Sequence, residues 1–202
     1  GGGRAAGGTG EHEDKIARVV LNAQCYGGHH VFADSPNNGP RMAALIEEFI
    51  PLLESQFNIG GSSKLRYLAG HSSGGWSSLW LQLNAPGFFN GTWSFAPDPI
   101  DFSDFQGIDL YASGANMYRD EAGERRPIAR MGERPVVWYD SFTAMDDVIG
   151  DGGQIHSFDW AFSQRGEDGT PRYMFDHETG VVAGGTDVLV VACGDGRDAS
   201  GF

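Results

Sequence analysis

The stretch "KLRYLAGHSSGGWSSLWLQLN", Lys64–Asn84, decides the fold class because it joins a strand pattern to a helix pattern through a short turn. Residues 64–69 alternate apolar and polar side chains, which predicts a short strand. Beyond the turn, apolar residues from Trp76 to Leu83 recur at helical spacing, and Asn84 ends the predicted helix. A strand that turns sharply into a helix is a unit of α/β proteins.

The turn itself, Gly70 to Gly74, fits the pattern G-x-S-x-G. On a tight strand-to-helix turn, glycines leave room for close backbone approach, and the central serine, Ser72, is lifted clear of the sheet. The pattern predicts Ser72 as a nucleophile and the backbone N–H of Ser73 as a donor to a developing oxyanion. The plainer alternative is a connection that happens to use Gly and Ser. A phosphate-binding loop is disfavoured because no G-K-[ST] follows.

The neighbouring segments extend the α/β pattern. Residues 15–23 read as a buried strand, 26–40 as a loop, 41–57 as a helix with a kink at Pro51, and 91–97 as a further strand. Strand, helix, strand, turn, helix and strand in this order indicate a mostly parallel sheet with right-handed crossovers and flanking helices.

The pattern becomes irregular over residues 98–180. A strand at 135–139, a short helix at 141–150 and a mixed segment at 156–166 are predicted there, and "VLVVAC" at 188–193 resembles one last buried strand. We expect one domain over residues 1–202. The glycine-rich ends, 1–14 and 180–202, are expected to be disordered or atypical.

Charge and composition exclude several classes of function. The formal charge of −13, with only 14 Lys and Arg, argues against a nucleic-acid partner and against an anionic membrane surface. No run approaches 18 apolar residues, so no transmembrane helix is predicted, and no signal peptide is visible. The two cysteines, Cys25 and Cys193, have no spacing that demands a disulfide.

Three segments together resemble a known family. They are "HHVFADSPNNGPRMAALIEEFIPLLE" (29–54), "LAGHSSGGWSSLWLQLNAPGFFNGTWSFAPDPIDF" (68–102) and "IDLYASGANMYRD" (108–120). The chain is similar over residues 16–180 to the putative esterases related to esterase D and the feruloyl esterases, which are α/β-hydrolases. The resemblance implies that Ser72 is the acyl-accepting nucleophile and that Ser73 supplies half of the oxyanion hole. It also implies small ester substrates, no cofactor and no metal.

The resemblance leaves the base and the acid of the site open. In α/β-hydrolases the acid and then the histidine follow the serine along the chain, but no histidine lies beyond residue 177. Asp198, after the predicted strand 188–193, is the candidate acid, with Asp195 second. The chain is therefore expected to be a fragment truncated at both ends, with a fold incomplete at the C-terminus, or to have a last 20 or so residues that are out of register with the ancestral protein. His156 and His177 could serve as a base only if their segment folds back over Ser72; otherwise they are exposed loop residues.

Other clusters of chemistry-bearing residues receive plain interpretations. Cys25, His29 and His30 lie close together, but a second pair of ligands at suitable spacing is missing, so no metal site is predicted. His71 is expected to pack rather than react. Solvated loop carboxylates explain two acidic clusters, which are Asp98, Asp101 and Asp104, and Asp146, Asp147 and Asp151. Core packing explains the aromatic residues Trp76, Trp80, Trp93 and Phe95.

The predicted function is therefore a serine esterase acting through a Ser72 acyl-enzyme. One alternative is an acyltransferase, which would hand the acyl group to a sugar or lipid hydroxyl on the same fold. The other is a non-catalytic binding remnant that keeps the turn but lacks the base histidine. Fold analogy does not choose among them, because function depends on the assembled site.

Overall fold

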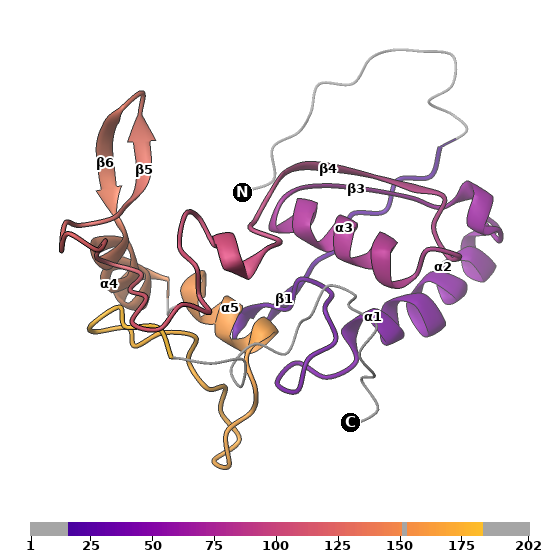
Figure 1. Cartoon of the computed structure of the whole chain (residues 1–202). Helices are drawn as coiled ribbons and strands as arrows, with labels where there is room; N and C mark the ends of the chain where they lie inside the picture. The colour runs from indigo at the N-terminus through magenta and orange to yellow at the C-terminus, as the bar shows by residue number, and fades with distance from the viewer. Residues whose placement is uncertain (1–15, 151–152, 184–202) are drawn as a thin grey trace.

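A computed structural model of the chain describes residues 16–150 and 153–183 (Figure 1). The elements are β1 (Gln24–Cys25), β2 (Gly28–His29), α1 (Arg41–Ala43), the π-helical η2 (Ala44–Phe49), α2 (Ile50–Phe57), the 3₁₀ turn η3 (Ser63–Leu65), β3 (Tyr67–Ser72), α3 (Ser73–Asn84), β4 (Gly91–Pro97), the 3₁₀ turn η4 (Phe102–Asp104), β5 (Pro127–Met131), β6 (Arg134–Trp138), α4 (Tyr139–Ile149) and α5 (Ile155–Phe162). Within the described ranges, no helix is long and apolar enough to cross a membrane.

The quoted stretch forms the β3–α3–β4 unit. β3 and β4 pair in parallel, with Tyr67 opposite Gly91, and the register shifts at the end, where Ser72 lies opposite Pro97. α3 packs against both strands and connects them (Figure 1). The predicted bounds of β4 are confirmed, whereas β3 begins later than predicted and continues through the turn to Ser72. Pairing with β4 explains this extension, because the ladder continues through His71 opposite Phe95 and, after a register shift, reaches Ser72 opposite Pro97.

The predicted helix at 41–57 is confirmed as one continuous run, α1–η2–α2. The Asp34 side chain, from the preceding loop, caps its first turn by accepting hydrogen bonds from the N–H groups of Met42 (2.6 Å) and Ala43 (3.4 Å). The π-helical hydrogen bonds of η2 immediately precede Pro51. Proline lacks an N–H and crowds the preceding turn, and a locally wider helix relieves both effects without ending the run.

The strand predicted over residues 15–23 is wrong for the residues described, which are 16–23. They have no strand pairing, and Val20 is 86% exposed. An apolar run forms a buried strand only where it pairs with the edge of a sheet. In the described part of the chain, β3 and β4 pair with each other and with no further strand. The predicted loop at 26–40 is correct apart from the small β1–β2 hairpin, which begins just before it.

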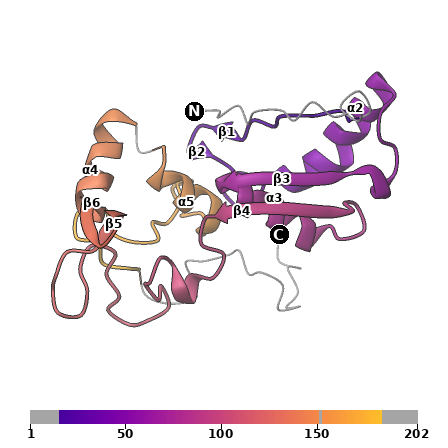
Figure 2. The same cartoon turned by 90° about the horizontal axis from the view of Figure 1, so that it is seen from above.

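The described chain is α/β, but its sheets are small. β1–β2 and β5–β6 are antiparallel pairs, so a mostly parallel sheet stays a prediction. The β5–β6 hairpin confirms the strand predicted near 135–139 and adds a partner that the sequence did not indicate. Figure 2 shows this hairpin and α4 on one side, the β3–α3–β4 unit on the other, and α5 between them.

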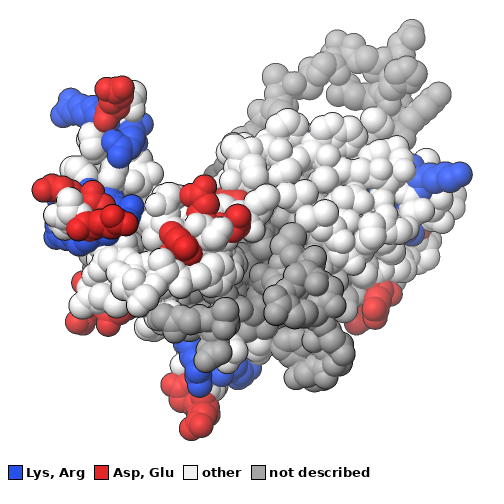
Figure 3. All heavy atoms as spheres, in the orientation of Figure 1, with Lys and Arg blue, Asp and Glu red and all other residues white. Residues whose placement is uncertain are grey.

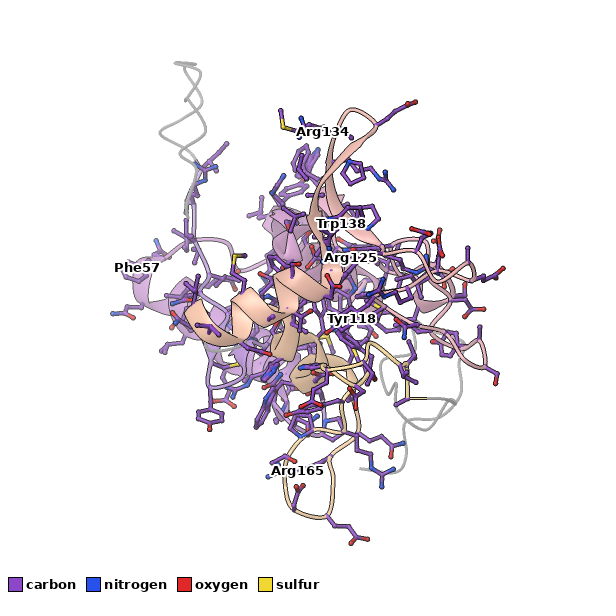
Figure 4. All side chains as sticks on the ribbon, turned by 90° about the vertical axis from the view of Figure 1, so that its left-hand side faces the viewer. Phe57, Tyr118, Arg125, Arg134, Trp138 and Arg165 are labelled. Carbon is purple, nitrogen blue, oxygen red and sulfur yellow. The ribbon has the colours of Figure 1, made fainter. Side chains whose placement is uncertain are left out.

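Arg125, just before β5, contacts both the end of β6 and the start of α4. The Arg125 guanidinium lies 5.0 Å from the ring centre of Trp138 and forms an ion pair with Asp140 in the first turn of α4. Figure 4 shows Arg125 and Trp138 at the base of the hairpin, with Arg134 farther out toward its tip. The helix predicted at 141–150 is confirmed as α4, and the mixed segment at 156–166 contains α5.

Two apolar clusters flank α3. Trp76 belongs to a large cluster with side chains from the segment after β4, including Phe102 and Phe162. Leu81 belongs to a smaller one with Leu45, and Trp80 packs against both. The segment predicted to be irregular therefore supplies most of the larger core. Burial of these side chains is the main favourable term that holds α3 in place.

The prediction of core positions for the aromatic residues is confirmed for Trp76 and wrong for Trp93 and Phe95. Trp93 and Phe95 lie on β4 and are 55% and 56% exposed. α3 covers one face of the β3–β4 pair, and these side chains are on the open face. Figure 3 shows charged side chains gathered over the β5–β6 hairpin and α4, whereas much of the surface over α2 and α3 is uncharged.

Candidate functional site

Ser72 occupies the sharp point between β3 and α3. Its backbone has φ 56° and ψ −123°, a strained conformation for a residue with a side chain, and such strain concentrates at functional sites. Gly70 makes the turn possible, because a Cβ there would lie 1.9 Å from the carbonyl oxygen of Gly74. A Cβ at Gly75 would lie 2.9 Å from the oxygen of Phe95, whereas Gly74 faces open space. Close approach thus explains Gly70 and Gly75 but not Gly74.

The Ser72 hydroxyl is exposed and held by Asp98. Ser72 Oγ donates to Asp98 Oδ1 at 3.0 Å, and Ser73 Oγ donates to Asp98 Oδ2 at 2.5 Å. The N–H of Asp98 also donates to the Ser72 carbonyl oxygen at 3.3 Å. The interpretation of Asp98 as a solvated loop carboxylate is therefore wrong. Its position directly after β4, the strand parallel to β3, is the sequence signal that could have identified it.

The N-terminus of α3 lies next to the Ser72 hydroxyl. The N–H of Ser73 is in the first helical turn, where amide groups have no acceptor within the helix and the helix dipole favours negative charge. Ser77 Oγ donates to the Ser73 carbonyl oxygen (2.7 Å), and Ser94 Oγ of β4 donates to that of Gly75 (2.9 Å). These bonds fix the start of α3 against β4, so the turn has a defined geometry.

Among the described residues, no hydrogen bond joins a histidine to Ser72 Oγ, which is bonded to Asp98. His71 is exposed, so the expectation that it packs is wrong. The Nε2 atom of His156 lies 3.3 Å from Asp147 Oδ1, and that of His177 lies 3.1 Å from Asp159 Oδ2. His156 is on α5 and the His177 side chain is 10% exposed, so neither is an exposed loop residue.

The remaining candidates could not be placed at the turn. The predicted acid, Asp198, its second choice Asp195, and His12 lie outside the described residues. Cys193 lies outside them as well.

His29 and His30, from the "HH" of the resembling segment, both have a pKa below the ordinary value of histidine. Burial lowers the pKa of His29, and the negative charge of Asp98 partly opposes this shift. Burial, with the positive charges of Arg41 and His29, lowers the pKa of His30 to about 4. His30 Nδ1 accepts a hydrogen bond from the Phe32 N–H at 3.1 Å, which requires an unprotonated nitrogen.

The loop between β2 and α1 has a structural role. Its asparagine Asn38 donates to the Trp160 carbonyl oxygen (3.1 Å), and Asn37 donates to that of Ser163 (2.7 Å), at the C-terminal end of α5. Asn38 Oδ1 lies 3.7 Å from Cys25 Sγ. Among the described residues, the side chains that gather like metal ligands are Asp147, His156 and His177, and not Cys25 and the adjacent histidines.

Comparison with known proteins gives one match. The model of a family described as "Putative esterase" matches residues 12–151, more than two thirds of the chain. No curated protein matches, and no solved structure matches. The matched range contains Ser72, Ser73 and Asp98 and ends after α4, so α5 lies beyond it.

Proposed function

The chain belongs to the putative esterase family, and from this membership we propose that it hydrolyses small carboxylic esters through an acyl-enzyme on Ser72. Membership supports a hydrolytic esterase function in general. The observation that carries the mechanism is the strained backbone of Ser72 at the end of β3, with its hydroxyl exposed beside the first turn of α3. We also propose that β3 and β4 belong to a larger parallel sheet of the α/β-hydrolase type.

The proposed reaction has two half-reactions. Ser72 Oγ bonds to the ester carbonyl carbon, and the carbonyl electron pair moves to the oxygen, where the Ser73 N–H stabilises the oxyanion. The oxyanion collapses, the C–O bond to the alcohol breaks, and the alkoxide leaves as the alcohol with the proton that Ser72 Oγ gave up. Water then attacks the acyl carbon, which releases the acid and returns a proton to Ser72 Oγ.

Asp98 orients the nucleophile in this scheme. Its Oδ1 accepts the Ser72 hydrogen bond and so fixes the direction of the hydroxyl. A carboxylate is a weaker base than an imidazole, so a histidine remains the expected proton acceptor. Asp198 remains the predicted acid that would orient such a base.

A second candidate function has one observation in its favour. In the part of the chain that the structure describes, the recorded partner of Ser72 Oγ is a carboxylate and not an imidazole. A turn held in this way fits a protein that keeps the shape of the nucleophile site and binds esters without cleaving them.

Labelling with a fluorophosphonate probe distinguishes the two functions. The probe reacts with an activated serine, so we expect rapid labelling of the 202-residue chain at Ser72, located by mass spectrometry. Ser72→Ala should abolish it. Ser55→Ala is the matched control, because Ser55 is an exposed serine on α2 outside the turn; this variant should be labelled like the wild type. A folded chain that is not labelled would contradict the acyl-enzyme and favour the binding function.

A further inference from the structure

A cluster of imidazole and carboxylate groups lies away from the nucleophile turn, where α4, α5 and the segment before residue 183 meet. One ligand atom each from Asp147 on α4, His156 on α5 and His177 lies within 4.8 Å of the other two. His177 also approaches Asp159, one turn along α5 from His156. Positions three apart on a helix share a face, so α5 presents both residues to the same place.

Two buried polar atoms beside this cluster, on Asp159 and His177, lack well-aligned hydrogen bonds. Asp159 is 1% exposed, and its Oδ1 accepts the Met174 N–H at 2.7 Å. Its Oδ2 has no hydrogen-bond partner, and neither has His177 Nε2, although the two atoms are 3.1 Å apart. Buried polar atoms are rarely left unpaired. Two atoms this close without an aligned hydrogen bond are placed like neighbouring ligands of a third atom.

We propose that Asp147, His156 and His177 bind one divalent transition-metal ion, of which Zn²⁺ is the best fit, with the buried Asp159 carboxylate beside His177. Zn²⁺ prefers ligands at 2.0–2.2 Å from imidazole nitrogen and carboxylate oxygen, and a tetrahedron of that size has edges of about 3.3 Å. The His156–Asp147 separation of 3.3 Å has this length, and the three ligand atoms lie within 4.8 Å of one another. The carboxylates of Asp147 and Asp159 also balance the charge of the ion.

The surroundings hold the three ligands in place. Three protein ligands leave the fourth position of a tetrahedral ion to a water molecule or to a shift of Asp159. Tyr173 stacks on His177 with ring centres 4.6 Å apart, and the Tyr118 hydroxyl donates to the His177 carbonyl oxygen at 2.7 Å. Figure 4 marks Tyr118 in this part of the molecule. These contacts limit the orientation of the imidazole.

Asp147 provides the route by which the ion enters. Its side chain is 41% exposed, so it can rotate inward to close the remaining gap. The preceding residue, Asp146, accepts the N–H groups of Gln154 (3.1 Å) and Ile155 (2.9 Å) and so keeps the start of α5 next to the end of α4. The ion would join α4, α5 and the segment before residue 183. The sequence predicted no metal there, because Asp147, His156 and His177 form no local motif of ligands.

The direct test is binding of Zn²⁺ and Co²⁺ to the purified, metal-free chain. We expect one equivalent of Zn²⁺ in competition with a chromophoric chelator, the visible absorption of four-coordinate Co²⁺, and a higher midpoint of thermal unfolding. His156→Gln and His177→Gln should each weaken Zn²⁺ binding by roughly 100-fold or more. His71→Gln is the matched control, because His71 is exposed and outside the cluster; it should bind Zn²⁺ like the wild type.

A second measurement, chemical modification of histidines, uses only the wild-type chain. The wild-type chain is treated with diethyl pyrocarbonate with and without Zn²⁺, and the modified histidines are located by mass spectrometry. Protection of His156 and His177, with no protection of His71, supports the proposal. A folded chain that binds no Zn²⁺ or Co²⁺ would overturn it and leave His177–Asp159 as a buried ion pair. Stoichiometric binding that protects other histidines would also overturn it. Neither readout depends on Ser72, so the esterase proposal is tested separately.

Discussion

Buried His30 should make the protein sensitive to mild acid. Its Nδ1 accepts the Phe32 N–H, and its pKa is lowered to about 4 from the ordinary 6.5 by burial and by the nearby charges of Arg41 and His29. The folded-state pKa is below the unfolded one, so between pH 6.5 and 4 the unfolded chain binds more protons. Stability therefore falls as the pH falls through this window, and His30 has no effect above it.

The size of the effect follows from the two pKa values. At pH 5.0 the unfolded imidazole is almost fully protonated and the folded one is almost fully neutral. The linkage relation then gives a loss of about 2 kcal/mol in the free energy of unfolding relative to pH 7.5, as an order of magnitude. This is a large share of the ordinary stability of a domain, about 5–15 kcal/mol.

Urea unfolding at pH 7.5 and 5.0 measures this loss in the wild type and in His30→Gln, whose amide oxygen can still accept a hydrogen bond. Other groups titrate in the same range, so the difference between the two pH-dependences isolates His30. We expect the wild type to lose about 2 kcal/mol more than His30→Gln. His71→Gln, at an exposed position, should behave like the wild type. Equal losses in wild type and His30→Gln would refute the depressed pKa.

Four further substitutions test close packing and one ion pair. Gly70→Ala should destabilise the chain by roughly 3 kcal/mol in urea unfolding because its Cβ meets backbone, whereas Gly74→Ala should change stability by less than about 1 kcal/mol. Trp76→Ala should cost about 3–5 kcal/mol in the same assay, since the ring is buried in the larger apolar cluster. Arg66→Ala should raise the pKa of Glu54 in an NMR titration, because the Arg66 hydrogen bonds are the main cause that lowers it.

Local patterns in the sequence predicted the elements whose structure depends on their own residues. The helix over 41–57 and the strand over 91–97 follow from apolar periodicity and flanking turn residues. The turn at Ser72 was predictable because its glycines and its strand–helix context are local. The strand at 15–23 was not, because an apolar run becomes a strand only when a neighbouring strand pairs with it.

Contacts between distant segments were the part that the sequence hid. Asp98 reaches Ser72 because the β3–β4 register places Ser72 opposite Pro97, and no single-segment pattern encodes that register. His156 and Asp159 share a helix face at a spacing of three, which was readable once a helix was assigned there. Their approach to Asp147 and His177 depends on how α4 and α5 pack.

Contacts with α5 support the helix that follows the nucleophile turn. Trp76, four residues after Ser72, lies against Phe162 of α5 with ring centres 4.9 Å apart. The loop before α1 donates hydrogen bonds to the end of the same helix. α5 lies beyond the residues that match the family, yet it covers the helix that begins at the nucleophile. The geometry at Ser72 therefore depends on a segment that carries none of the chemistry proposed there, and any ion held by α5 would stabilise that geometry from a distance.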